Sequence, residues 1–164
     1  MQIFTFMKPA SVSEIKKDLE KSSHRELLDY CIRLIKFKKE NKELIAFMLF
    51  ESDDIAGYLE RIKQETNVLF SEINQSNIYF IKKSIRKILR NLNKQIRFTL
   101  SSQVEAELLI HFCICFEDYS IPVNQSRQLS NLYEAQLKRI EKALSMLHPD
   151  LQFDLTRQLN KNSQ

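Results

Sequence analysis

The residues with the clearest chemical potential form a dense run of positive charge between Ser76 and Phe98. This stretch contains seven Lys or Arg residues and no Asp or Glu. Drawn as a helix with 100° per residue, six of the seven fall within a sector about 100° wide. We call these six residues the basic row: Lys83, Arg86, Lys87, Arg90, Lys94 and Arg97. Such a row attracts phosphates and carboxylates, so it is the best candidate binding surface of the chain.

The basic row also repels itself, because like charges four residues apart on a helix destabilise it. The acidic segment that precedes it, residues 40–72, holds eight Asp or Glu residues. We therefore predict that acids of residues 52–72 neutralise the row, in particular Glu60, Glu65 and Glu72. A polyanion such as nucleic acid, an acidic protein partner, or screening by solvent ions are the alternatives.

No nucleic-acid-binding motif accompanies the basic row. The sequence contains no helix-turn-helix spacing, RNP motif or zinc-finger pattern. Tyr79, Phe80 and Phe98 lie near the ends of the same stretch, but aromatic residues occur throughout the chain. We expect these three rings to pack in the core.

A second chemical candidate is the segment "HFCIC", which places His111 and Cys115 four residues apart on one helical face. This spacing can bind a metal, but no second ligand pair accompanies it. We predict instead that Cys31, Cys113 and Cys115, which lie in apolar runs, are free buried thiols. Because no G-x-S-x-G or P-loop motif is present either, we predict no metal, no cofactor and no catalytic activity.

The composition predicts an all-α fold to position these residues. Of 164 residues, one is Gly and three are Pro, whereas 43% are hydrophobic and recur every three or four positions. This pattern predicts helices near residues 12–21, 24–39, 42–50, 53–73, 77–98, 103–117, 127–147 and 150–159. Three serines followed by Glu three positions later predict helix-capping boxes: Ser11, Ser23 and Ser102. Gly57, alone inside a helix, is expected to mark a close crossing of two backbones.

Nothing in the composition divides the chain. We predict a single compact domain over residues 11–160, a poorly ordered or docked segment over 1–10 and a tail over 161–164. Six to eight antiparallel helices would form a bundle or a short stack of helical hairpins. No stretch approaches the ~18 apolar residues of a membrane helix and no signal peptide is evident, so we predict a cytoplasmic protein with no membrane contact. Met1 and Met7 are both possible start residues.

The chain resembles the uncharacterised all-helical bacterial families that have no assigned activity. The resemblance rests on "ELLDYCIRLIKFKKENKELIAFMLFE" and "SEINQSNIYFIKKSIRKILRNLNKQIR" and extends loosely over most of the chain. It implies an all-helical fold and supplies no site residues. We predict a non-enzymatic intracellular module that acts through protein–protein contacts. The alternative is nucleic-acid binding through the basic face of the helix at 77–98.

Overall fold

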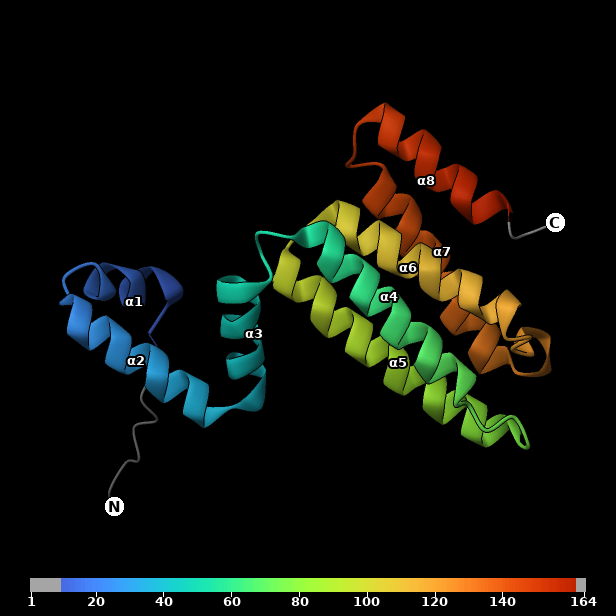
Figure 1. Cartoon of the computed structure of the whole chain (residues 1–164), viewed down its shortest axis with the longest axis horizontal. Helices are drawn as coiled ribbons and strands as arrows, with labels where there is room; N and C mark the ends of the chain where they lie inside the picture. Colours follow the sequence, from blue (N-terminus) through green and yellow to red (C-terminus); the bar gives the residue numbers. More distant parts are fainter. Residues whose placement is uncertain (1–9, 162–164) are drawn as a thin grey trace, which may run out of the picture. The chain divides into compact units, whose positions relative to one another are not determined.

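The computed structural model of the chain describes residues 10–161, and within this range it contains helices and no strand (Figure 1). The predicted all-α class is therefore confirmed. Eight α-helices and one short 3-10 helix follow one another: α1 Val12–Leu19, α2 His24–Phe37, α3 Lys39–Phe50, α4 Ile55–Ser71, α5 Ile78–Thr99, α6 Ser102–Asp118, η1 Val123–Gln125, α7 Arg127–Leu144 and α8 Pro149–Lys161.

The described residues pack into two units that meet inside α3, one up to Phe47 and the other from Met48 onward. The sequence analysis treated residues 11–160 as one domain. It gave no sign of the division because α3 is continuous through the boundary, so no Gly- or Pro-rich linker marks it. The segments predicted for residues 1–10 and 161–164, and the choice of start residue, fall outside the described residues except for Ala10 and for Lys161, which ends α8.

The first unit contains α1, α2 and most of α3. Both α1 and α2 begin with the predicted capping box, in which a serine hydroxyl and a glutamate carboxylate satisfy each other's backbone N–H groups. Ser11 pairs with Glu14 in this way, and Ser23 pairs with Glu26. These bonds lower the pKa of both glutamates. Neither helix contains a buried residue, so local capping rather than a core defines them.

The second unit holds the core, and α6 is its centre. The helices α4 to α8 run successively up and down (Figure 1), and α6 contacts α4, α5, α7 and α8. Nine residues of α6 are buried, among them Phe112 and Phe116, which make edge contacts with Phe70 of α4. Edge-to-face rings at 5.6 and 5.9 Å fit the preferred aromatic geometry. This packing holds α5 on one side of the unit.

Two local predictions in this unit are wrong. The helix α6 is capped by Ser101 rather than Ser102, since the Ser101 hydroxyl accepts a hydrogen bond from the backbone N–H of Val104. Gly57 marks no helix crossing. Its backbone N–H donates to the carboxylate of Asp54, the residue that caps α4, and a Cβ at this position would overlap that carboxylate.

Candidate functional site

The basic row occupies the solvent-facing side of α5. The opposite side of this helix is an apolar stripe buried against the unit: Ile81, Ile85, Ile88, Leu92 and Ile96. Of the basic row, Lys83, Arg86, Lys87, Arg90 and Arg97 are exposed and Lys94 is half-buried. The structure thus brings all six predicted residues together on one face, because the apolar stripe alone decides which side of α5 is buried.

Polar contacts on both flanks fix the rotation of α5 about its axis. On the α4 side, the Tyr58 hydroxyl donates to Oε1 of Gln95 at 2.5 Å. On the α7 side, Arg139 donates to Oδ1 of Asn93 at 2.7 Å and also to the carboxylate of Glu105. These bonds fix which side of α5 faces α4 and leave the basic row on the side turned away from α4.

The predicted neutralisation by residues 52–72 is wrong for Lys83, Arg86, Lys87 and Arg90. Within the described residues, none of these four forms an ion pair with any acid of that segment, and Glu60 instead pairs with Lys63 at 3.2 Å. The two helices are neighbours, as expected, but the side of α5 that faces α4 is uncharged. Ser84 and Asn91 lie within about 40° of Gln95 around the helix, so they stand between the acids and the row.

Among residues 10–161, the side-chain hydrogen bond of these four residues runs from Arg86 to a neutral side chain on α7. Oε1 of Gln128 accepts hydrogen bonds from Arg86 and from Lys82, both at 3.2 Å. For the rest of the described chain, Lys83, Lys87 and Arg90 make neither an ion pair nor a side-chain hydrogen bond. Their positive charge is therefore not compensated by the described acids.

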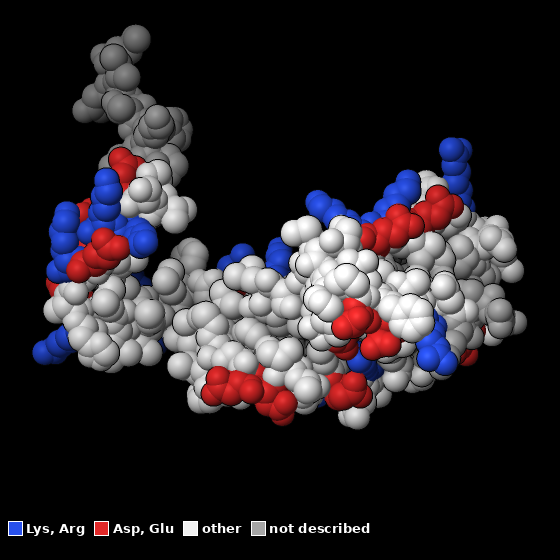
Figure 2. All heavy atoms as spheres, turned by 90° about the horizontal axis from the view of Figure 1, so that it is seen from above, with Lys and Arg blue, Asp and Glu red and all other residues white. Residues whose placement is uncertain are grey.

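The positive surface extends onto α7. Around that helix, Lys142 lies within about 40° of Gln128, on the side that reaches α5, and Lys138 lies about 80° from Gln128, next to that side. Both side chains are exposed. These lysines could not be assigned to the surface from the sequence, because long-range contacts such as Gln128 to Arg86 and Arg139 to Asn93 show that the two stretches are neighbours. In the view of Figure 2, Lys and Arg side chains gather along the upper edge of the larger unit, where Asp and Glu side chains lie beside them.

The aromatic residues at the start of α5 were placed wrongly. Tyr79 is 61% exposed and Phe80 is 44% exposed, whereas only Phe98 is partly buried. Asn77, which caps α5 by accepting a hydrogen bond from the backbone N–H of Tyr79, sets where the helix begins. Around the helix both rings lie on the side away from the buried stripe that begins with Ile81, which leaves them outside the core.

His111 and Cys115 both form hydrogen bonds to residues of α4. Nε2 of His111 lies 2.9 Å from Oδ1 of Asn67 and 3.2 Å from the carbonyl oxygen of Lys63, so this nitrogen donates. The Cys115 thiol donates to the same Asn67 oxygen. Burial lowers the pKa of His111 and raises the pKa of Cys115 to about 12, so imidazole and thiol are both neutral at pH 7.

The other two cysteines differ in their exposure to solvent. Cys113 is buried, as predicted, and burial raises its pKa to about 12. Cys31 is exposed, so its predicted burial is wrong, because α2 contributes no residue to a core. In the part of the chain that is described, no three His, Cys, Asp or Glu side chains come together as metal ligands would.

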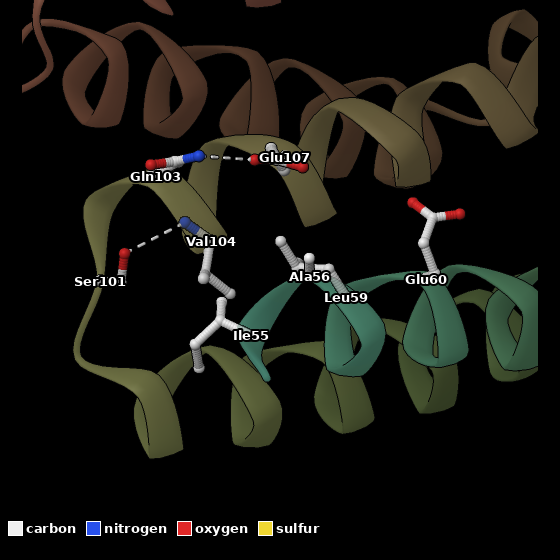
Figure 3. A pocket seen from close by; sticks show the side chains of 8 residues that line it. All are labelled: Ile55, Ala56, Leu59, Glu60, Ser101, Gln103, Val104 and Glu107. Carbon is white, nitrogen blue, oxygen red and sulfur yellow. Dashed lines mark hydrogen bonds between the residues drawn. The ribbon is translucent and has the colours of Figure 1, made fainter. Parts of the chain in front are cut away.

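A hollow of about 410 Å³ lies between the first turns of α4 and α6 (Figure 3). Its apolar wall is formed by Ile55, Leu59 and Val104, and two carboxylates, Glu60 and Glu107, stand at its edge. Lys63 bridges both carboxylates at 3.2 Å, and Gln103 donates to Glu107. The polar groups at this edge therefore bond to one another.

Comparison with known proteins gives one partial likeness. The chain is 28% identical over 125 residues to an ATP-dependent RNA helicase DBP5 of Eremothecium gossypii, and 28% identical over 124 residues to the protein of the same name from Kluyveromyces lactis. Each match covers 76% of this chain but only 24% of the helicase. No family model and no solved structure matches. The resemblance to uncharacterised bacterial families stays a prediction.

None of the described helices is both long enough and apolar enough to span a bilayer.

Proposed function

We propose that the protein binds nucleic acid through the basic row. The observation that carries this proposal is the exposure of Lys83, Lys87 and Arg90 without compensating acids. Three unpaired cations on one rigid helix keep their full attraction for phosphates, and release of counterions from the polyanion favours binding. Arg86, Lys138 and Lys142 enlarge the same surface.

RNA is the nucleic acid to test first. The two similar proteins are RNA helicases by name, and the likeness covers 76% of this chain, including α5. We propose binding without ATP-driven unwinding, since a P-loop requires two glycines and the sequence contains one. The role in protein–protein contacts and the cytoplasmic location stay predictions.

A pair of charge-reversal variants tests the proposal. Lys83→Glu, Lys87→Glu and Arg90→Glu together remove the three unpaired cations of α5. The matched control is Lys17→Glu, Arg25→Glu and Arg33→Glu, which changes the net charge equally at exposed positions of the first unit. Fluorescence anisotropy with a labelled 12-nucleotide RNA at ~50 mM salt should show micromolar binding by the unmodified protein.

We expect the α5 variant to lose at least tenfold in affinity and the control variant to lose much less, because local charge density rather than net charge attracts the phosphates. Equal losses in the two variants would contradict the assignment to α5. The absence of binding by the unmodified protein would contradict the proposed function itself.

A further inference from the structure

The exposed rings of Tyr79 and Phe80 lie at one end of the basic row. Their centroids are 5.5 Å apart and the ring planes meet at 73°, an edge-to-face pair that keeps one ring face of each partner open. Around α5, Tyr79 lies within about 20° of Arg86 and Arg90, so it continues the same side of the helix. Aromatic rings and unpaired cations therefore form one continuous strip.

Building on the proposed function, we infer that this strip binds single-stranded nucleic acid, with bases stacked on Tyr79 and Phe80 and phosphates along the row. Proteins that bind single strands combine a positive surface with aromatic side chains, because an unpaired base offers its face to a ring. The bases of a duplex are already stacked on one another. A duplex would thus contact the cations and gain nothing from the rings.

The dimensions of the strip fit a short single strand. From Tyr79 to Arg90 the helix rises about 17 Å, and to Arg97 about 27 Å. This length suits about four nucleotides, which is the lower end of the site sizes that single-strand-binding folds use. Stacking tolerates any base, so we expect little sequence preference.

Because the sequence contains no Trp, the fluorescence of one introduced Trp reports binding at its position. Tyr79→Trp places a single indole at the proposed stacking position, and Tyr30→Trp places one at a comparably exposed position of the first unit as the matched control. Titration with a single-stranded 12-nucleotide RNA, the same sequence as DNA, and the blunt RNA duplex should quench the indole at position 79 with both single strands. Neither the duplex nor the control position should show this quenching.

The companion variant Tyr79→Ala with Phe80→Ala should weaken single-strand binding about tenfold or more and change duplex binding less than twofold, because base–aromatic stacking is lost and the cations remain. Tyr79→Phe should retain the affinity, since the ring is kept. Circular dichroism checks the fold of each variant.

The outcomes separate the two proposals. Equal binding of single strand and duplex, unchanged by removal of the rings, would overturn the stacking inference and leave the proposed function standing. Quenching by single-stranded DNA and not by RNA would support stacking and identify the ligand as DNA instead of RNA. No binding of any of the three probes at ~50 mM salt would overturn both proposals.

Discussion

At the residue scale, Ile85 and Lys87 separate the structural side of α5 from the binding side. Ile85 is completely buried, whereas Lys87 is exposed and unpaired. We expect Ile85→Asp to lower the free energy of unfolding by several kcal/mol, because a buried carboxylate has no partner there. Lys87→Ala should change it by less than about 0.5 kcal/mol and still weaken RNA binding. Chemical denaturation measures both, and a comparable loss of stability in Lys87→Ala would contradict the orientation of α5.

His111 predicts a specific pH dependence of stability. Burial lowers its pKa in the folded state below the ordinary value of about 6.5, although the hydrogen bond to the Lys63 carbonyl opposes this shift. Above pH 6.5 the imidazole is neutral in both states and its contribution is complete. As the pH falls below 6.5, the unfolded chain takes up the proton first, so stability decreases.

The measurement compares urea denaturation at pH 7.5 and pH 5.5. The unmodified protein should lose stability at the lower pH, and His111→Gln should lose less, since glutamine does not titrate. The capping carboxylates do not obscure this window, because the lowered pKa values of Glu14 and Glu26 lie below 4.5. An identical pH dependence in both proteins would show that His111 is not the group responsible.

At the element scale, the residue that ends α5 has an unfavourable backbone conformation, which a substitution can relieve. Leu100 adopts the left-handed conformation with φ of 50°, and its side chain is 92% exposed. Glycine adopts this conformation without steric cost and is preferred just after a helix. Leu100→Gly should therefore raise the free energy of unfolding by about 0.5–1 kcal/mol, since little packing is lost.

The matched control is Thr99→Gly, one position earlier and inside the helix. Glycine there should cost about 1 kcal/mol, because it loses more conformational freedom on folding and because the hydrogen bond from the Thr99 hydroxyl to the carbonyl oxygen of Ile96 is lost. Thermal unfolding ranks the three proteins. A decrease in stability for Leu100→Gly would mean that the exposed leucine makes a contact that its exposure does not suggest.

Part of this helical arrangement could be predicted from the sequence, and part of it could not. The boundaries of α4 and α5, the buried stripe from Ile81 to Ile96 and the composition of the basic row follow from helical periodicity, because a 22-residue amphipathic helix has only one side to bury. The rotation of α4 against α5 does not follow from it. That rotation depends on long-range contacts such as Tyr58 to Gln95, so the expected pairing of Glu65 and Glu72 with Lys83, Arg86, Lys87 and Arg90 was wrong.

The same limit explains the aromatic residues and the lysines of α7. Sequence composition favours burial of Tyr79 and Phe80, but both rings lie on the side of α5 away from the buried stripe. The sequence around Lys138 and Lys142 does not mark them as binding residues, since exposed lysines are common on solvated helix faces. Their association with the basic row depends on the contact between Gln128 and α5.

At the scale of the whole molecule, charge is polarised rather than merely positive. The net charge is +4, whereas residues 73–104 alone carry seven Lys or Arg residues and no acid, so the remaining chain is net acidic. A polarised molecule orients a polyanion toward one face and repels it from the others. The central claim is that the exposed face of α5 makes this contact.

The dependence of affinity on salt tests this claim most directly. For a single strand, the slope of log K against log salt concentration is about −0.7 per neutralised phosphate. Between 50 and 200 mM KCl, the slope for a single-stranded 12-nucleotide RNA should become shallower by about 2 in Lys83→Glu, Lys87→Glu, Arg90→Glu, because three phosphate contacts are lost. The control Lys17→Glu, Arg25→Glu, Arg33→Glu should keep the slope of the unmodified protein. A slope that is the same in all three proteins would contradict binding through α5.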